Sequence, residues 1–527
     1  MKRTIWEITG DLVAQSPLHI GAAESGSLID AVLVRDGLGR YLVPGTTLAG
    51  VLRARLDGDS AVWGDVEDDE ATTSAVTVFD AWTGDSVAIE ERTTTSIDRV
   101  TGAAAAHHLF SREYLAEGTT FRFRALIEGD AERPELEQEA IRIAALLRTG
   151  IAVGAKTSSG YGLIKSKNVE ILRKSFERSR LLATLGVAGK PARVDHLKHR
   201  ETQDLLVVTV PFTAAGAVFV ADSRDGGEIG QLPLTASRGA NTHFVIPGTS
   251  SKGALRSHAE VIARTVTDVD APAYDPEKPS SFLDQLTSVG LHAVGDLFGR
   301  ANEKADASRD ATGSQDTGNS AAIRVHETLS ETKIPATQWE ALINAKNKQD
   351  VHSRVRNLNR QLNKSGAHLV FATRNSIDRF SGGTVDAKLF TALEPHVAWQ
   401  PLTLEIDLDA LTRNTADRDR EKATLVPNSD RRNAALALLL FILLDMADGI
   451  PDGGLRLGAD VTRGSGGLRV DRKQITLTAS RGSYAERLNG SLDEVLADDD
   501  LLEELSGAWS RQIAHPGDDQ KAEESHV

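Results

Sequence analysis

PGTTLAGVLR at residues 44–53 returns as PGTSSKGALR at residues 247–256. TSIDRVTG at 95–102 returns, in the same order, as NSIDRFSG at 375–382. Matches that recur in one order indicate a tandem duplication, in which one structural unit is encoded twice along the chain. The two copies can therefore be compared position by position, and a difference between them marks a place where one copy has lost or moved its chemistry.

A third, looser pair carries the duplication to the end of each copy, GAKTSSGYGLIK at 154–165 and GADVTRGSGGLRV at 458–470. A chain of 527 residues is also too long for a single hydrophobic core. We predict a first domain at 1–175, a basic linker at 176–203, a second domain at 204–475 with an insertion at about 270–320, and an acidic, partly disordered C-terminal extension at 476–527.

The composition is typical of a soluble globular protein, with 40% hydrophobic and 26% charged residues. The chain has no cysteine, which excludes disulfides and thiolate metal sites. Its N-terminus lacks the apolar core of a signal peptide. The longest apolar run, AALALLLFILLDMA at 434–447, is too short to span a bilayer and predicts a buried helix. We therefore expect a cytoplasmic protein with no membrane partner.

The net charge of −15 is concentrated in acidic segments, DVEDDE at 65–70, DDDLLEE at 498–504 and DDQKAEE at 518–524. Two other segments are basic, since residues 173–200 carry eight Lys and Arg against two acids and residues 346–364 carry six against one. Each is either a solvated face or a surface that follows a phosphate backbone, because local charge and not net charge sets the field there.

Both copies predict the order strand, helix, strand, strand, helix, strand. This β-α-β-β-α-β order is that of the ferredoxin-like (RRM-like) fold, so the predicted fold class is α+β with two tandem domains of this kind. In the first copy we expect strands at 5–14, 76–82, 119–129 and 161–172, and helices at 133–150 and from the PGT turn to Leu56, the latter capped by the Thr46–Thr47 pair. In the second copy we expect strands at 204–212, 321–327, 402–408 and 466–470, helices at 249–266 and 433–449, and a mobile loop at 302–321.

The ordered motifs carry a family resemblance. Taken together, five motifs resemble those of the RAMP superfamily of CRISPR systems. They are SPLHIG, the PGT or PGTS helix start, WG…VTVFDA or LFG…AIRVHE, SIDR, and a glycine-rich stretch before the last strand. Within it, the pattern is similar to the backbone subunits of type III effector complexes, and two units in one chain resemble the fused subunits of type III-D. The resemblance covers residue 4 to about 470. It implies RAMP domains with inserted loops and thumb-like hairpins that bind CRISPR guide RNA, complementary target RNA and other effector subunits.

The PGT motifs begin a helix, and free N–H groups at a helix N-terminus can hold phosphate. The resemblance implies that this helix start grips the backbone of the guide RNA. Plain helix capping is the alternative, and for the two arginines a structural salt bridge is an equally good interpretation. The candidates are Thr46, Thr47 and Arg53 in the first copy, and Ser250, Ser251, Lys252 and Arg256 in the second.

The glycine-rich loops at 154–162 and 458–467 let backbone approach a ligand that side chains would obstruct. One such loop is more often a turn, but two in equivalent places, each leading into a strand, favour an RNA-facing role. Neither is a Walker or Rossmann motif, because the strand-loop-helix context is missing. The candidates are Lys156, Ser158 and Ser159 in the first loop, and Thr462 and Arg463 in the second.

The segment at 96–118 begins with SIDR and continues into small residues. The resemblance implies that it forms a thumb that crosses the guide RNA and flips bases out, with Ala103–Ala106 and Leu109 as an apolar wedge. The equivalent segment of the second copy is 376–396.

Other polar residues in these segments have simpler explanations. Asp98–Arg99 and Asp378–Arg379 are better explained as intrachain ion pairs. His107 and His108 suggest acid/base catalysis, but they have no counterpart in the second copy and are better explained as incidental.

Whether the protein cuts RNA depends on one loop. In subunits that cut target RNA, the resemblance implies an aspartate between the first strand and the PGT helix, and in GSLIDAVLVRDG at 26–37 that residue is Asp30. A carboxylate there can bind a divalent cation, expected to be Mg²⁺, or position the 2′-hydroxyl beside a phosphate. Asp36 is better explained as the turn residue of the RDG segment.

The second copy lacks an obvious equivalent of Asp30. Counting back from its PGTS helix start, the position is taken by Pro233. Asp222, Asp225 and Glu228 lie upstream and could substitute only if the loop were rebuilt. We therefore predict that only the first copy cuts RNA.

Three functions remain open from the sequence. The favoured one is a guide-binding backbone subunit that also acts as a metal-dependent endoribonuclease on target RNA. The second is a scaffold that binds guide RNA without cutting. The third is a guide-processing endoribonuclease, which needs a histidine acid/base constellation that the chain does not supply convincingly.

Overall fold

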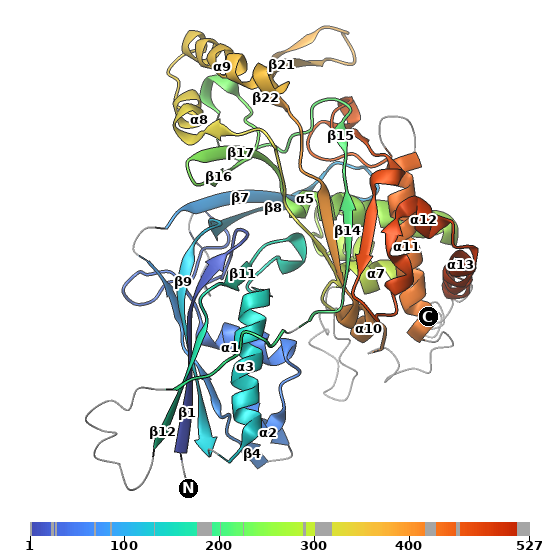
Figure 1. Cartoon of the computed structure of the whole chain (residues 1–527). Coiled ribbons are helices and arrows are strands. Elements are labelled where there is room, and N and C mark those ends of the chain that lie inside the picture. The colour runs from blue at the N-terminus through green and yellow to red at the C-terminus, as the bar shows by residue number, and fades with distance from the viewer. Residues whose placement is uncertain are drawn as a thin grey trace. The chain divides into compact units, whose positions relative to one another are not determined.

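The computed structural model of the chain describes residues 3–22, 26, 29–67, 70–84, 87–130, 132–176, 192–200, 202–224, 226–287, 291–300, 319–416, 428–448 and 454–513. Most of the predicted linker, most of the predicted loop at 302–321, the tail beyond 513 and Asp225 lie outside these residues. The chain forms two compact units, Met1–Arg92 with Phe110–Thr202, and Thr93–Leu109 with Gln203–Val527. Figure 1 labels their elements.

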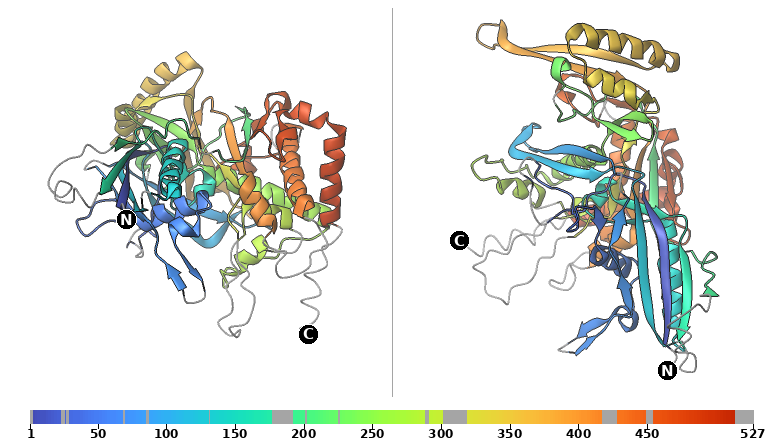
Figure 2. Two further views of the ribbon diagram at one scale, coloured as in Figure 1. Left: turned by 60° about the horizontal axis from the view of Figure 1, so that its bottom comes forward. Right: turned by 90° about the vertical axis from the view of Figure 1, so that its left-hand side faces the viewer.

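The first unit is built on an antiparallel sheet around β1. Its elements are β1 (Arg3–Ala14), β2 (Leu42–Val43), α1 (Gly45–Arg55), α2 (Ser60–Trp63), β3 (Asp65–Glu67), β4 (Glu70–Thr72), β5 (Val76–Val78), β6 (Ala81–Thr83), β9 (Thr120–Asp130), α3 (Pro134–Thr149), β10 (Ile151–Ala152), η1 (Thr157–Ser159), β11 (Leu163–Ser166), β12 (Glu170–Phe176) and β13 (Ala192–Arg193). β1 pairs with β9 on one side and with β11 and β12 on the other. β3 and β4 form a small separate hairpin (Figure 2).

The core of the first unit lies between this sheet and α3. Trp6, Ile8 and Leu12 alternate along β1 and are buried, as expected for a strand with one face on the core. Leu136 and Ile143 of α3 belong to the same hydrophobic cluster, and Figure 1 shows α3 lying along the sheet. Among the core strands the order is β11–β1–β9–β5, so the last strand of the copy lies beside the first.

Two details of the first copy differ from the prediction. The expected strand at 76–82 is divided into β5 and β6, and both pair with β9. The Thr46–Thr47 cap is absent, because α1 starts after Pro44 with no side-chain cap from its own turn. Instead the carboxylate of Asp80, which follows β5, accepts the Gly45 N–H at 2.8 Å. A carboxylate therefore already lies at the positive end of this helix.

The second unit is larger and repeats the strand and helix order. Its elements are β14 (Leu205–Val210), β15 (Thr213–Ala214), η3 (Gly227–Ile229), β16 (Thr235–Arg238), β17 (Asn241–Ile246), α5 (Gly248–Thr267), α6 (Ser281–Thr287), α7 (His292–Phe298), β18 (Ile323–Val325), β19 (Thr328–Leu329), β20 (Ile334–Pro335), α8 (Ala336–Ile343), α9 (Lys348–Leu362), η4 (Asn363–Ser365), β21 (His368–Ile377), β22 (Thr384–His396), β23 (Leu402–Asp407), α10 (Leu408–Ala416), α11 (Asn428–Asp448), η6 (Val461–Arg463), β24 (Leu468–Arg469), η7 (Arg472–Gln474), β25 (Thr476–Ala479), η8 (Glu486–Leu488), β26 (Gly490–Ser491), α12 (Leu492–Leu496) and α13 (Asp499–Ile513). The central sheet has the order β18–β23–β14–β25–β26.

The end of the second copy extends past the predicted boundary at 475. The expected last strand, β24, pairs with β15, and it is β25 that joins the central sheet beside β14. α13 packs on α11, where the rings of Phe441 and Trp509 are 5.6 Å apart. The apolar run at 434–447 lies in α11 and is largely buried, as predicted. Among the described helices, none combines the length and apolar character needed to cross a membrane.

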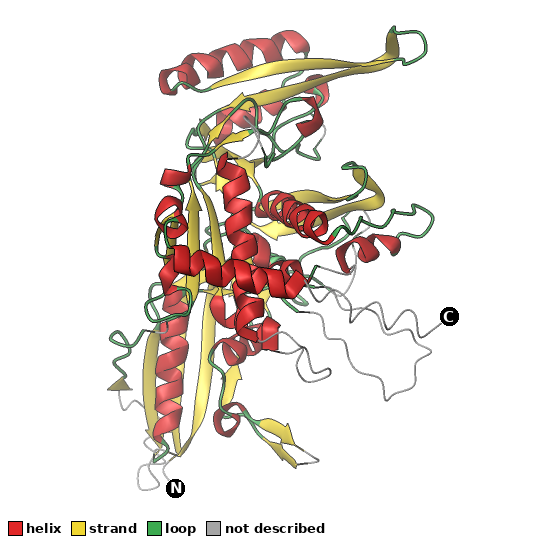
Figure 3. Ribbon diagram, turned by 90° about the vertical axis from the view of Figure 1, so that its right-hand side faces the viewer, coloured by secondary structure: helices red, strands yellow, loops and turns green. Residues whose placement is uncertain are grey.

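Each copy also carries a long two-stranded hairpin. The first consists of β7 (Ile89–Ile97) and β8 (Ala104–Leu115), and the second of β21 and β22. The distal part of the first hairpin, Thr93–Leu109, belongs to the second unit. α9, which the sequence analysis did not predict as a helix, lies alongside the second hairpin (Figure 3).

Candidate functional site

The glycine loops of the two copies have the same backbone. Lys156 and Asp460 both adopt the left-handed conformation, at φ 60° and 58°, and each precedes a 3-10 turn, η1 or η6. A Cβ on Gly154 would lie 2.2 Å from the His19 carbonyl oxygen, and one on Gly458 would lie 2.2 Å from that of Phe219. These two glycines are thus needed for close approach to the chain's own backbone, and the RNA-facing role of the loops stays a prediction.

Asp30 lies where the loop after β1 meets β8. Ala31 forms a bridge with Arg112, with backbone hydrogen bonds from Ala31 N to Ser111 O and from Glu113 N to Ala31 O. The exposed Asp30 carboxylate accepts hydrogen bonds from the Ser111 N–H at 2.7 Å and the Ser111 hydroxyl at 2.9 Å. These bonds hold the pKa of Asp30 below its usual value, so the carboxylate is ionised at neutral pH.

Two cations of the first unit, Arg112 of β8 and Lys156 of the glycine loop, lie near one another. Arg112 is the residue after Ser111, and its guanidinium lies 5.1 Å from the centre of the Phe110 ring. Lys156 reaches solvent, but the protein packed around it and the positive charge of Arg112 lower its pKa. Within the described part of the chain neither cation has a carboxylate partner, and the Arg112 Nε is buried without a hydrogen-bond acceptor. Like charges held together without a counter-ion are suited to an anion such as phosphate.

The second copy repeats the backbone of this site. Gln231 donates from its N–H to Thr391 O and accepts from Leu393 N, as Ala31 does with Ser111 and Glu113. The equivalent of Asp30 is therefore Gly230. The prediction of Pro233, made by counting back from the PGTS motif, was wrong. Gly230 has φ 83°, and a Cβ on it would lie 2.8 Å from Thr391 O, so this backbone excludes a carboxylate side chain.

None of the charged groups of the first site is kept in the second copy. Arg112 corresponds to the buried Ala392, and Lys156 corresponds to Asp460. Asp460 is neutralised by ion pairs with Arg374 and Arg463. Of the proposed substitutes, Asp222 is buried and accepts hydrogen bonds from Arg224, whereas Glu228 is exposed on η3.

The structure favours structural roles for the helix-start arginines. Arg53 donates to Gly64 O at 2.9 Å, and Arg256 donates to the equivalent Gly299 O at 3.2 Å. Arg256 also pairs with Glu260 at 2.8 Å. This is the structural alternative that the sequence analysis left open.

The remaining predicted RNA contacts differ in accessibility. Ser251 and Ser159 are buried, which is incompatible with a surface contact in this structure. Lys252 and Ser158 are half-buried and already engaged within the chain. Those that reach solvent at least in part are Thr46, Thr47, Ser250, Thr462 and Arg463.

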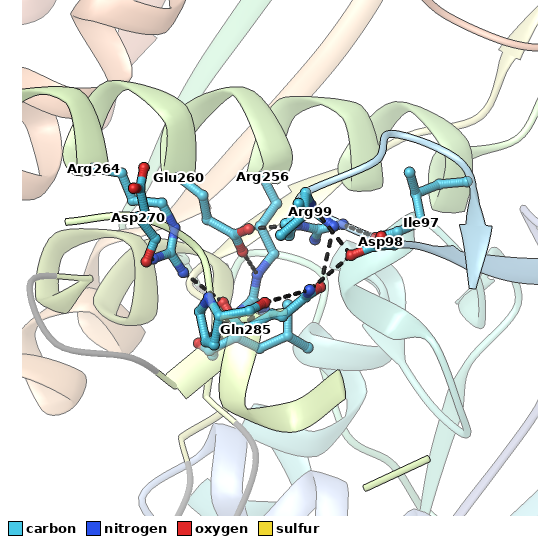
Figure 4. A network of polar contacts seen from close by, with 12 residues as sticks. Ile97, Asp98, Arg99, Arg256, Glu260, Arg264, Asp270 and Gln285 are labelled. Atoms are coloured by element: carbon cyan, nitrogen blue, oxygen red, sulfur yellow. Dashed lines mark hydrogen bonds and ion pairs between the residues drawn. The ribbon is translucent and has the colours of Figure 1, made fainter. Parts of the chain in front are cut away.

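Both hairpin tips share a turn that the predicted Asp–Arg ion pairs do not explain. Asp98 accepts the N–H groups of Val100 and Thr101, and Asp378 accepts those of Phe380 and Ser381. These Asx-type bonds use the aspartate to close the turn, so it is not paired with the arginine that follows it. Arg99 pairs with Glu260 instead, at 2.5 Å (Figure 4).

Neither histidine in the first hairpin gains support as a catalytic group. His107 is exposed, with φ 64°. The ring of His108 packs against Phe282 at 4.9 Å, and its Nε2 lies 3.3 Å from Pro279 O. Leu109, part of the predicted wedge, is 72% exposed.

Sequence reasoning missed Ser111 and Arg112, although both lie in the SRE stretch of the first hairpin. The sequence did contain a clue to them. The second copy has Thr391 and Ala392 at the equivalent positions, so the copy that lacks the Asp30 carboxylate also lacks the Arg112 cation. The pairing of hairpin and loop that makes these positions meet is not visible in the sequence.

A model of the RAMP superfamily matches residues 11–165 and 218–469. Each matched segment contains one copy of the duplicated motifs. No curated protein matches the chain. Among solved structures, a chain of "Type III-B Cmr-beta Cryo-EM structure of the Apo state" is similar at 15% identity and a TM-score of 0.27, covering 31% of this chain and 96% of that one.

Proposed function

The chain belongs to the RAMP superfamily, and from that premise we propose that it is a type III CRISPR effector backbone subunit with two fused units. In this role it binds guide RNA and cuts complementary target RNA at the first unit, beside other effector subunits. The observation that supports this most directly is the cluster in the first unit. An exposed, ionised carboxylate, Asp30, is bonded to Ser111 of β8, and the next residue, Arg112, lies near a second cation, Lys156. Neither cation has a carboxylate partner within the described part of the chain.

This cluster suits cleavage by the RNA's own 2′-hydroxyl. The 2′-oxygen would attack the adjacent phosphorus and lose its proton, while the bond to the 5′-oxygen breaks and that oxygen gains a proton. The products would be a 2′,3′-cyclic phosphate and a 5′-hydroxyl. Because its pKa is lowered, Asp30 is a weak base, which favours orienting the 2′-hydroxyl over removing its proton. Arg112 and Lys156 would stabilise the charge that develops on the phosphate oxygens.

A divalent cation fits this cluster only together with RNA. The described residues hold no group of three or more His, Asp or Glu able to bind a metal, and Asp30 is a single carboxylate. Mg²⁺ is commonly held by one or two carboxylates plus substrate phosphates. We therefore propose that Asp30 and the bound RNA would share the cation, which would neutralise charge on the phosphate.

Replacing Lys156 with aspartate is expected to weaken target RNA binding and to lower the salt slope of log K by about 1, the loss of one phosphate contact. Asp460 adopts the same left-handed backbone in the second copy, so aspartate should be accommodated without refolding the loop. The measurement is fluorescence anisotropy with labelled target RNA, added to the guide-loaded protein, over a series of salt concentrations.

The matched control is Lys167→Asp, the same charge change at an exposed turn of the first unit. Equal losses in both variants would contradict a specific phosphate contact at Lys156 and leave only a net-charge effect.

A second observation favours RNA binding by the second unit. α9 buries an apolar stripe of Val351, Val355, Leu358 and Leu362. Its opposite face and the turn after it expose the cations Lys348, Arg356, Arg360 and Lys364, which have no carboxylate partners in the described part of the chain. The helix lies beside the second hairpin (Figure 3).

The double variant Arg356→Glu with Arg360→Glu should weaken guide RNA binding by about tenfold or more at moderate salt, because two contacts become repulsive. The same anisotropy assay would measure it. Lys473→Glu with Arg481→Glu, an equal charge change at exposed positions around η7 and β25, should have little effect. A similar loss in both pairs would rule out a role specific to α9.

A further inference from the structure

The two hairpins differ at their bases in one pair of facing residues. In the second hairpin His368, the first residue of β21, is paired directly with His396, the last residue of β22. The residue offset that relates the two SIDR motifs makes Ala88 and Ala116 their counterparts in the first hairpin. These two alanines also face each other, since Ala116 N donates to Ala88 O at 3.0 Å. The two copies therefore share the backbone pairing and differ at both positions together.

The two histidines lie ring against ring. Their imidazole centroids are 4.8 Å apart, and the ring planes differ by only 2°. Among the described residues neither ring has a hydrogen-bond partner, and since His368 is exposed and His396 half-buried, solvent reaches the pair. Burial and the nearby His368 lower the pKa of His396, although Glu394 opposes the shift. His396 is therefore a neutral imidazole at neutral pH, which is the form that binds metal ions.

We propose that His368 and His396 together bind one divalent metal ion of the Zn²⁺, Ni²⁺ and Cu²⁺ class, which clamps the base of the second hairpin. Residues directly opposite each other in an antiparallel pair have Cβ atoms about 4.5–5.5 Å apart. Each imidazole turns readily about its χ2 bond, so one nitrogen of each ring can come within about 2.0–2.1 Å of a shared ion. Imidazole nitrogen suits these metals, whereas Mg²⁺ prefers oxygen ligands.

This site has two protein ligands and leaves the other coordination positions to water. Glu394, two residues before His396 on the same strand, is buried and paired with Arg374, so it is not a third ligand. The described residues contain no group of three or more His, Asp or Glu able to hold a metal. Structural zinc sites use four protein ligands and catalytic ones use three. An ion held by only two exchanges with solution, so the clamp would respond to the concentration of the metal.

Equilibrium dialysis of the full chain against Zn²⁺ tests the site. His368→Ala and His396→Ala should each lower the affinity of one Zn²⁺ site by at least about 100-fold, because the remaining imidazole loses the effective concentration that the second ligand supplies. Alanine is the residue at both equivalent positions of the first hairpin, so the variants should fold. With EDTA present, they should melt at the same temperature as the unmodified chain.

The matched control is His352→Ala, which removes an exposed histidine of α9 in the same unit and should retain the ion. A large excess of Mg²⁺ should not displace Zn²⁺ from the site, because Mg²⁺ prefers oxygen ligands. Unchanged Zn²⁺ binding in His368→Ala and His396→Ala, or an equal loss in His352→Ala, would overturn the proposal.

Hydrogen exchange measured by mass spectrometry tests whether the ion clamps the strands. Zn²⁺ should slow amide exchange in peptides that contain the start of β21 and the end of β22, because the ion opposes local opening of the hairpin base. The base of the first hairpin, where Ala88 faces Ala116, should be unchanged, and the slowing should disappear in His396→Ala. Zn²⁺ that binds without slowing exchange at the second base, or that slows it equally in both hairpins, would show that the two histidines do not form a clamp.

Discussion

Replacing Asp30 with alanine is expected to lower the rate at which the first unit cleaves guide-paired target RNA by at least about 100-fold. Guide and target binding should be nearly unchanged, because Asp30 is an anion and contributes no attractive phosphate contact. The measurement is a cleavage time course with the assembled complex, in which other cutting subunits are inactivated, followed by mapping of the product ends.

Two further variants separate charge from loop structure. Asp30→Asn keeps an oxygen that can accept the Ser111 hydrogen bonds but removes the charge, and should be as inactive as Asp30→Ala. Asp36→Ala removes another carboxylate of the same loop, one that bonds to Arg40, and should retain the cut. If the cut persists in both Asp30 variants, the scaffold function replaces the proposed nuclease.

The wild-type subunit should make one cut and not two. Gly230 occupies the position of Asp30 in the second copy, and Asp460 replaces Lys156 there. Two cuts separated by one repeat unit would show that another carboxylate, with Glu228 as the exposed candidate, serves the second copy.

Replacing Arg431 with methionine is expected to destabilise the second unit by about 3–5 kcal/mol, because it strands a buried carboxylate. Asp296 of α7 is fully buried, and both of its carboxylate oxygens accept hydrogen bonds from Arg431 Nη2 at 3.1 Å. Arg431 of α11 also donates to Thr415 O of α10 at 2.6 Å. One guanidinium therefore joins three helices of the second core.

This destabilisation should depend on pH. Burial raises the pKa of Asp296 to about 6, although Arg431 opposes the shift. A carboxyl with a raised folded-state pKa contributes stability that is complete below its unfolded pKa and is lost as pH rises through about 6. Without Arg431 the pKa should rise further, so the deficit should be larger near pH 8 than near pH 5.

Scanning calorimetry at both pH values would measure this. Arg413→Met, the same change at an exposed position of α10, should be nearly neutral. Asp296→Asn combined with Arg431→Met should recover part of the loss, because no charge is then buried. A melting temperature for Arg431→Met equal to that of Arg413→Met would contradict the role of this pair.

Patterns local in sequence were enough to predict the main elements. The alternation in β1, the helical spacing after Pro44 and the apolar run of α11 each act through neighbouring residues, so they can be recognised without knowing the fold. The ordered motifs, seen twice, predicted the superfamily for the same reason. α9 was missed because its four apolar positions are spaced along a strongly basic segment that was considered only for its charge.

Positions that depend on pairing between distant segments were harder to predict. Counting residues back from the PGTS motif led to Pro233, because the loops of the two copies differ in length between that motif and the bridge to the second hairpin. Hydrogen bonds do not depend on loop length, and they identify Gly230 as the equivalent of Asp30.

From its own residues the chain specifies a duplicated α+β architecture, a composition typical of globular proteins and one distinctive aspartate. Tertiary structure decided what surrounds that aspartate, because Ser111 and Arg112 are brought to its loop only by a strand bridge from a distant part of the chain. Tertiary structure also decided that two tips of nearly identical sequence make different contacts. Arg99 is packed against Glu260 of α5, whereas Arg379, which has almost the same neighbours in sequence, is exposed.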